Sequence, residues 1–429
     1  KIFLIFIIIN NCSLNTNSNI WTKGKKIVKE KQKTIKLLFK DEEGLKSEFN
    51  PKLKIKLKGK LVNNSFINNF NNNNGRINYK GNLKKISRFT FSKIDHFDEL
   101  EPEIIFSKNN VIFFDNKGSI LKFNNSSKLI WKKNFYSKSE RKLKPILFLA
   151  SNDNTLIVAD SISKYYGINI KTGELLWSKN HSAHFNSQVK IHKDKFFAID
   201  SQNVLICYSI KDGSEIWKVK TERTLIKSVK KLSLIIIDNK IYFNNSIGDI
   251  AAVDIRNGNL LWLTPTHSSE IIGQSFFLKS SNLVANNDSI FFSNNNNKFF
   301  SIDLRTGILN WEHKINSTLT PTLVDNLLFT VTMEGFFVIV ENKEGNIIRI
   351  TDIFKQFKKK KRSKIKPVGF VVGSENIYLT TNHGRLMIID IASGKTISML
   401  KIDNDKISRP FVLNENLYII KENSIIKLN

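Results

Sequence analysis

The sequence is poor in the residues that build disulfide scaffolds and metal sites. Its 429 residues include only two cysteines and seven prolines. Two cysteines are too few for a disulfide framework, a cysteine-rich zinc site or an iron–sulfur centre. The seven histidines, His181, His184 and His192 among them, have neither metal-ligand spacing nor a paired nucleophile. We therefore expect them to be solvated or structural.

Negative charge is also scarce. The chain has 67 Lys and Arg against 38 Asp and Glu, a formal net charge of +29. Such an excess is typical of nucleic-acid-binding proteins, but abundant Lys, Asn and Ile are also typical of a biased genome composition. Both interpretations are open at this point. A hydrophobic fraction of 41% excludes a wholly disordered chain, and the length predicts two or three domains or one large repeat fold.

No hydrophobic run is long enough to cross a membrane as a helix. The most apolar stretch, Ile2–Ile9, has eight residues, whereas a spanning helix needs about 20. This stretch fits the hydrophobic region of a secretory signal, with Lys1 as the remainder of its basic start. We therefore expect residues 1–11 to be a signal peptide and, because no Met precedes Lys1, to be incomplete at their start.

The cysteine that follows this stretch resembles the lipobox of bacterial lipoproteins. In that family the thiol is acylated and the cysteine becomes the new N-terminus, which here implies lipidation of Cys12. Ile9 suits the third position before the cysteine, but Asn11 stands where a small residue is usual. Ser13 favours sorting to the outer membrane. The alternative is a plain secretory signal followed by an incidental cysteine.

Residues 12–80 lack the apolar periodicity of a folded core. Thr22–Lys36 is basic and polar, and Asn63–Asn74 is nearly all asparagine. This composition predicts a lipid-anchored tether with an Asn-rich low-complexity segment. Within it, Lys52–Lys58 alternates Lys with apolar residues, a pattern that predicts a short strand at a sheet edge.

A repeated motif dominates the remainder of the chain. Each copy has an alternating strand, a polar turn that ends in Gly, and a second strand with Trp four residues after the Gly. Four copies are nearly complete: Tyr166–Trp177, Cys207–Trp217, Ala251–Trp262 and Phe300–Trp311. Three are degenerate: Leu121–Trp131, Val338–Arg349 and Met387–Ser398. The mean spacing of about 44 residues is the length of a four-stranded propeller blade.

The motif has a local physical basis. The glycine tolerates the positive φ that a tight hairpin demands. Asp254, Asp303 and Asp390 stand four residues before their glycines, where a carboxylate can accept hydrogen bonds from turn N–H groups. We expect the Trp to pack between adjacent blades; its alternative role is to stack on a ligand.

The strand count predicts eight blades, with seven as the alternative. Three strands, at 409–413, 417–422 and 424–429, follow the seventh repeat. Gly81–Ile94 begins like the end of a repeat, so we expect it to supply the missing fourth strand and to protect the edges of an open ring. The predicted fold is therefore an all-β, eight-bladed β-propeller over residues 81–429, closed by an N-terminal strand.

The repeat resembles that of pyrroloquinoline-quinone-type (PQQ-like) propellers, which two families share. The residues that carry the resemblance are Trp131, Gly173, Trp177, Gly213, Trp217, Gly258, Trp262, Gly307 and Trp311. One family is the PQQ-dependent alcohol and glucose dehydrogenases. The other is the family of the outer-membrane protein assembly factor BamB, lipoproteins with an eight-bladed propeller and no catalytic activity.

The dehydrogenase resemblance implies features that this chain lacks. That family stacks its cofactor with help from a vicinal disulfide and binds Ca²⁺ with Glu, Asn and Asp beside a catalytic Asp. Cys207 stands alone in a predicted strand, where we expect a small buried hydrophobe. We therefore expect no enzyme activity, no catalytic or metal residues and no cofactor, with the quinoprotein as the alternative.

The BamB resemblance fits more of the chain. It implies a periplasmic scaffold, anchored to the outer membrane, that binds the central subunit of the barrel-assembly complex and unfolded outer-membrane proteins, the latter by strand addition. The family's partner-binding loops follow blades three and four, which correspond here to Leu225, Ile226, Lys227 and Glu270. Loop residues without a partner role, and a generic periplasmic interaction propeller, are the alternatives.

One insertion departs from the repeat. Gln356–Lys366 is a dense basic run between the sixth and seventh repeats. We interpret it either as a solvated loop or as a contact with anionic lipid headgroups or lipopolysaccharide. Nucleic acid is the weaker interpretation of the charge, because no recognition motif or stacking pattern accompanies it.

Overall fold

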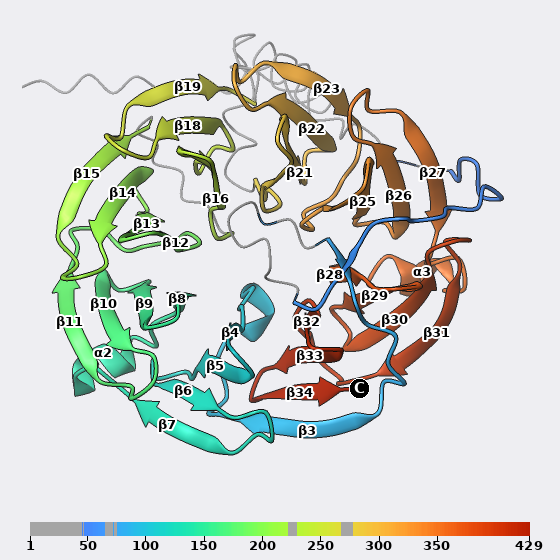
Figure 1. Ribbon diagram of the computed structural model, residues 1–429. Helices are drawn as coiled ribbons and strands as arrows, with labels where there is room; N and C mark the ends of the chain where they lie inside the picture. Colours follow the sequence, from blue (N-terminus) through green and yellow to red (C-terminus); the bar gives the residue numbers. More distant parts are fainter. Residues whose placement is uncertain (1–44, 46, 65–71, 73–74, 222–229, 267–277) are drawn as a thin grey trace, which may run out of the picture. The chain divides into compact units, whose positions relative to one another are not determined.

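Within the unit Gly44–Asn429, eight sheets surround a common axis like the blades of a propeller (Figure 1). The computed structural model describes residues 45, 47–64, 72, 75–221, 230–266 and 278–429. Among these residues each blade has four antiparallel strands, and one blade carries two further short strands. The prediction of an eight-bladed, all-β propeller is confirmed.

The strands of the first four blades follow one another in chain order. Blade 1 is β4 (Ile105–Ser107), β5 (Asn110–Phe114), β6 (Ile120–Phe123) and β7 (Leu129–Lys133). Blade 2 is β8 (Leu147–Ser151), β9 (Thr155–Asp160), β10 (Lys164–Asn169) and β11 (Leu175–Asn180). Blade 3 is β12 (Lys190–His192), β13 (Lys195–Ile199), β14 (Val204–Ser209) and β15 (Glu215–Lys220). Blade 4 is β16 (Leu234–Ile237), β17 (Lys240–Asn244), β18 (Ile250–Asp254) and β19 (Leu260–Thr264).

The remaining blades repeat this order, except that the last takes one strand from the N-terminal side. Blade 5 is β20 (Val284–Ala285), β21 (Ser289–Asn294), β22 (Lys298–Asp303) and β23 (Leu309–His313). Blade 6 is β24 (Thr322–Val324), β25 (Leu327–Val331), β26 (Phe336–Glu341) and β27 (Ile347–Asp352). Blade 7 is β28 (Pro367–Val372), β29 (Asn376–Thr381), β30 (Arg385–Asp390) and β31 (Thr396–Lys401). Blade 8 is β32 (Phe411–Leu413), β33 (Asn416–Lys421), β34 (Ser424–Leu428) and β3 (Lys85–Thr90).

The position of a strand within its blade explains its residues. The two middle strands are covered on both faces by neighbouring blades, so β13 and β14 are buried almost throughout. The outermost strand β15 is exposed or half-buried along its length. Continuous apolar runs therefore form the middle strands, and mixed sequences form the rim.

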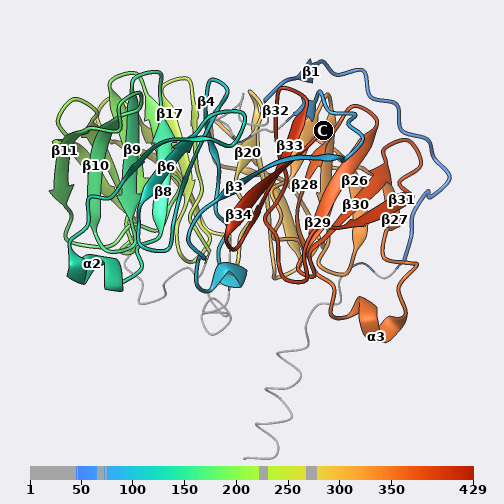
Figure 2. The same ribbon diagram turned by 90° about the horizontal axis from the view of Figure 1, so that it is seen from below.

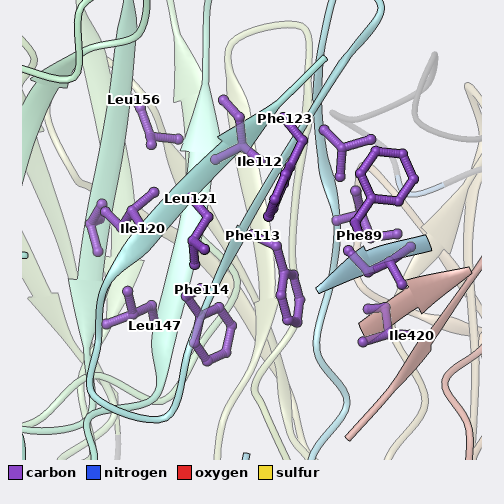
Figure 3. Close-up of a cluster of buried hydrophobic side chains, with 14 of the residues drawn as sticks. Phe89, Ile112, Phe113, Phe114, Ile120, Leu121, Phe123, Leu147, Leu156 and Ile420 are labelled. Carbon is purple, nitrogen blue, oxygen red and sulfur yellow. The ribbon is translucent and has the colours of Figure 1, made fainter. Parts of the chain in front are cut away.

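The hydrophobic core is divided among the contacts between adjacent blades. Figure 3 shows one such cluster, in which Phe113 of β5 and Leu121 of β6 lie near Phe89 of β3 and Ile420 of β33. All four side chains are almost completely buried. The cluster thus joins blade 1 to blade 8 across the two ends of the propeller sequence.

The eighth blade contains strands from both ends of the propeller. β3 pairs antiparallel with β34, from Lys85 opposite Leu428 to Thr90 opposite Ser424. The N-terminal stretch Gly81–Ile94 therefore lies where the strand count placed it, as the outermost strand of blade 8 (Figure 1).

The segment before β3 contacts the later blades. β1 (Leu61–Val62) and β2 (Arg76–Ile77) pair in parallel, and Arg76 of β2 lies opposite Val372 of β28. The edge strand predicted at Lys52–Lys58 is wrong, because no strand forms there. Its one buried apolar residue, Ile55, packs in the core cluster of blades 6 and 7, and its N–H donates to a turn carbonyl, that of Ala392, rather than to a sheet edge.

Among the described residues, three short helices occur in the connections between strands. They are η1 (Phe97–Glu99), α2 (Lys138–Lys142) and α3 (Lys359–Arg362). Ser137 and Glu140 form a capping box at the start of α2. α3 lies inside the basic run 356–366. None of the helices in the described part of the chain is both long and apolar enough to cross a membrane.

Candidate functional site

The tryptophan of each complete repeat packs against the glycine turn of the next blade. A Cβ on Gly213, whose φ is +69°, would lie 2.5 Å from Cζ3 of Trp177. The indole Nε1 of Trp177 donates to the carbonyl of Ile210, three residues before that glycine, at 2.8 Å. Equivalent pairs of indole and acceptor are Trp217 with Ile255, Trp262 with Leu304, and Trp311 with Asn342. The repeated Trp and Gly are therefore contacts between blades.

The aspartates of the repeat accept hydrogen bonds inside their own turns, as expected. Asp254, Asp303 and Asp390 each accept a bond from a backbone N–H two or three residues later, at 2.7–2.8 Å. The side-chain hydrogen bond from Arg256 lowers the pKa of Asp254 to about 2. These carboxylates stabilise the hairpins in their ionised form.

Sequence reasoning missed a second set of turn residues, at the opposite ends of the blades. In the turns between the second and third strands, one side chain accepts bonds from the N–H groups two and four residues later. The residues that do so are Asp115, Asp160, Asp200, Asn245 and Asn294. Their recurrence at about one repeat length was the signal that could have identified them.

In the sixth repeat an arginine occupies the position of the tryptophan. Arg349 is completely buried and donates to the carbonyl of Ile391 at 2.9 Å, the equivalent of the indole acceptors in the other blades. It also donates to the carbonyls of Ala392 and, at 2.9 Å, Leu53. The substitution therefore adds a contact with the N-terminal segment to the contact between blades.

The first repeat lacks the usual bond to the next blade. Nε1 of Trp131 is buried without a hydrogen-bond partner. The carbonyl of Ile170, which corresponds to the acceptors of the other indoles, instead accepts a bond from Nζ of Lys122 at 2.7 Å. The ammonium group has thus displaced the indole as the donor at this turn.

The strand order places all connections between blades at one end of the propeller. Each blade begins and ends at this end, because its four strands alternate in direction. The turns between second and third strands lie there too, and Figure 2 shows α2 and α3 at the same end. We call this end the connection face; the glycine turns form the opposite face.

The predicted partner residues belong to two stretches of the chain that the structure does not describe. Leu225, Ile226, Lys227 and Glu270 lie outside the described residues, in the stretches 222–229 and 267–277. The connections start after β15 and β19, the outermost strands of blades 3 and 4. The prediction for these four residues therefore stays a prediction.

The stems of both connections are anchored in the same way. Thr221 is buried, and its N–H and Oγ1 donate to the carbonyl of Asn203 at 3.3 and 3.0 Å. Thr266 is also buried; its Oγ1 donates to the carbonyl of Gly248 at 3.1 Å and its N–H donates to Asp249 Oδ1 at 3.2 Å. Both connections therefore leave fixed points on neighbouring blades.

The outermost strands expose apolar side chains beside an edge that pairs with no described strand. In blade 3, Ile216 is 44% exposed; in blade 4, Leu260 and Leu261 are 48% and 45% exposed. β15 and β19 each pair on one side only, with β14 and β18. Such an edge can accept a further strand by backbone hydrogen bonding.

The described cysteine and histidines have structural contacts. Cys207 is free and fully buried, which confirms it as a small core residue, and burial raises the pKa of its thiol to about 12. Nε2 of His181 lies 3.1 Å from Oδ2 of Asp200, and its Nδ1 lies 3.3 Å from the hydroxyl of Tyr208. No three described His, Cys, Asp or Glu residues are grouped to hold a metal ion. Cys12 lies outside the described residues.

Comparison with known proteins identifies one family. The family model described as outer membrane protein assembly factor BamB matches residues 116–351, more than half of the chain. No curated protein sequence matches.

Three solved structures illustrate the similarity of fold. BamB from Moraxella catarrhalis is 15% identical, with a TM-score of 0.64 over 81% of this chain and 99% of that one. The computationally designed protein Ika8 is 14% identical, with a TM-score of 0.60 over 79% and 99%. The C-terminal WD40 domain of Sif2 is 14% identical, with a TM-score of 0.58 over 83% and 99%. At these identities the structures share the propeller fold.

Proposed function

The chain belongs to the family of the outer membrane protein assembly factor BamB, and from this premise we propose that it is a non-enzymatic scaffold of the outer-membrane barrel-assembly machinery. The family match carries the proposal. It runs from the second half of blade 1 to the last strand of blade 6 and includes both connections that correspond to the family's partner-binding loops. The scaffold binds the central assembly subunit through the connection face.

The rigid stems of the two connections support this role. Thr221 and Thr266 fix the starts of the stretches 222–229 and 267–277 to adjacent blades. Loops carried by a rigid framework lose little conformational entropy when they bind a partner. We propose that Leu225, Ile226, Lys227 and Glu270 contact the assembly subunit there.

A pull-down tests both the function and the residues. The processed protein, tagged at its C-terminus, should recover the barrel-assembly complex from envelope extracts in mild detergent. Lys227→Glu and Glu270→Lys should each reduce recovery at least about tenfold, since reversing a contact charge costs several kcal/mol and about 1.4 kcal/mol already lowers the affinity tenfold. Lys211→Glu, in a glycine turn on the opposite face, is the matched control.

The outcomes separate the two claims. Failure of the unmodified protein to recover the complex would contradict the proposed function. If both charge-reversal variants recover as much of the complex as the Lys211→Glu control does, the proposed function is supported, but Lys227 and Glu270 are excluded as contact residues.

We also propose that unfolded outer-membrane proteins add a strand to the rim of the propeller. The exposed apolar residues of β15 and β19 support this, because strand addition gains both backbone hydrogen bonds and side-chain burial. A photoreactive residue at position 216 should crosslink an unfolded barrel protein, and one at position 211 should not. Equal crosslinking at both positions would contradict the proposal.

The proposed location is the periplasmic face of the outer membrane, through lipidation of Cys12. A Cys12→Ser variant should leave the membrane fraction, because a plain propeller carries no acyl chain to anchor it. Tight membrane association of this variant would refute the lipid anchor.

The proposal includes the absence of catalysis. Addition of the quinone and Ca²⁺ should produce no dye-linked alcohol oxidation. Saturable oxidation under these conditions would favour the quinoprotein alternative instead.

A further inference from the structure

A cavity of about 750 Å³ lies at the axis of the propeller. Its described lining comes from the starts of the innermost strands, for example Gln188 in blade 3, Leu319 in blade 6 and Val368 in blade 7. Innermost strands start on the connection face, so the cavity lies toward that face. Its size is in the range of small-molecule sites, which is about 300–1,000 Å³.

The lining is rich in lysine. The segments that lead into the innermost strands of blades 4, 5, 7 and 8 carry Lys230, Lys279, Lys366 and Lys406, and Lys231 adds a fifth ammonium group. Because all five residues line the same axial cavity, these groups converge on one space. The fold itself does not require lysine in this lining, because blade 6 contributes Thr318 to it and blade 3 contributes Asn186.

Four carboxylates, those of Asp98, Glu99, Glu101 and Glu103, line the cavity beside the five lysines and neutralise only part of their charge. Glu101 Oε1 lies 3.2 Å from Nζ of Lys230, and Glu103 Oε2 lies 3.1 Å from Nζ of Lys231. Glu103 Oε1 also lies 3.8 Å from Arg409 Nη2. Burial opposes ionisation of Glu103, but Lys231, Arg409 and Lys190 outweigh it and lower its pKa to about 2. These three cations hold Glu103 in its ionised form.

Three lysines of the lining form no ion pair with a described carboxylate. Lys406 donates to the backbone carbonyls of Asp98 and Leu100, the second at 3.0 Å, and Lys366 donates to that of Met333 at 3.5 Å. Lys279 is exposed at the cavity. Cations held by neutral acceptors around one cavity favour a ligand that brings several negative charges.

We infer that this axial cavity binds a compact phosphate-bearing ligand through Lys279, Lys366 and Lys406. Lysine binds phosphate as a point charge, whereas planar carboxylates favour the fork of arginine, and no arginine is among the described residues that line this cavity. The phosphate belongs either to a soluble oligophosphate or to a lipid headgroup presented at the connection face. This inference goes beyond the proposed scaffold function and does not rest on it.

Calorimetry on the full processed chain tests the site, with sodium tripolyphosphate as probe at constant ionic strength. Binding should be saturable with one site per chain. Lys279→Gln and Lys366→Gln should each weaken it about five- to tenfold, and Lys279→Arg should restore most of the affinity. Lys359→Gln and Lys360→Gln in α3 remove exposed lysines of the same face that do not line the cavity, so they should change affinity less than about twofold.

The result that overturns the inference is the absence of saturable binding, or an equal loss in the α3 controls, which would indicate only nonspecific attraction of anions. A second arm identifies the source of the phosphate. Binding to phosphatidylcholine vesicles that contain phosphatidic acid, lost in Lys279→Gln and displaced by tripolyphosphate, would identify a lipid headgroup. Tripolyphosphate binding without such vesicle binding would identify a soluble anion.

Discussion

Replacement of the buried Arg349 by methionine should destabilise the propeller by about 3–5 kcal/mol. Its guanidinium donates three hydrogen bonds to backbone carbonyls, each worth about 1.5–3 kcal/mol because the donor is charged. Methionine leaves these buried carbonyls without a donor, while it removes the cost of burying a cation, which is several kcal/mol. The balance is a net loss, and with a urea m-value of about 3 kcal/mol per M the midpoint should fall by about 1–1.7 M.

A second variant separates the two contacts of this residue. Arg349→Trp restores the donor that other repeats use, toward the carbonyl of Ile391, but cannot reach Leu53 as well. It should therefore recover about half of the lost stability. Both variants should release the N-terminal segment, so a lysine-specific protease should cleave between Lys52 and Lys60 faster than in the unmodified protein.

The result that would refute this reasoning is a loss of less than about 1 kcal/mol in Arg349→Met. Unchanged protease cleavage in both variants would show that the bond to Leu53 does not hold the segment. A control for general charge effects is Lys343→Met, which removes an exposed cation from a turn of the same blade and should leave the urea midpoint unchanged.

Three further outcomes are expected. Gly213→Ala should cost about 2–4 kcal/mol in urea unfolding, because it combines a positive φ with a clash against Trp177; a cost below 1 kcal/mol would contradict this packing. The pKa of Glu103 is about 2 in the folded protein, below its usual value of 4.5, so its stabilising contribution is complete above pH 4.5 and disappears as the pH falls toward 2. Glu103→Gln should therefore lower the melting temperature at pH 7, where Lys231 loses its partner, and flatten its dependence on pH between 5 and 2; an unchanged slope would exclude this carboxylate as the cause. Ser137→Ala should remove the cap of α2 and cost the helix about 1 kcal/mol, seen as faster hydrogen exchange of the Glu140 amide; unchanged exchange would show that the cap is unimportant.

The regular part of the fold could be predicted because the same residue types recur in the same structural roles from one repeat to the next. Glycine at a positive φ and a tryptophan on the outer strand occur together in each complete copy, and in two of these copies Asp254 and Asp303 accept the hydrogen bonds of the turn. The strand count also indicated where β3 belongs, since a blade with three strands leaves one edge unpaired.

The irregular contacts could not be predicted, because they join residues that no repeat relates. In the sequence, Arg349 could be recognised only as a departure from the Trp of the repeat. Its partner Leu53 is separated from it by 296 residues. Ile55 lies in a lysine-rich run whose alternation predicted a strand, but its backbone bonds to a turn instead. The lysines of the axial cavity come from four blades, and only the ring brings them together.

The pairing of β3 with β34 also determines the order of events during biogenesis. Arg88 and Asn423, which share a hydrogen bond across these strands, are 335 residues apart in the chain. Joining such distant segments costs about 5 kcal/mol of loop entropy, repaid only once both strands exist. β3 must therefore wait for β34, which is synthesised much later, and until then β3 presents an open edge. In this interval a neighbouring copy of the chain can occupy that edge, so the protein is most vulnerable to strand exchange and aggregation before β34 is synthesised.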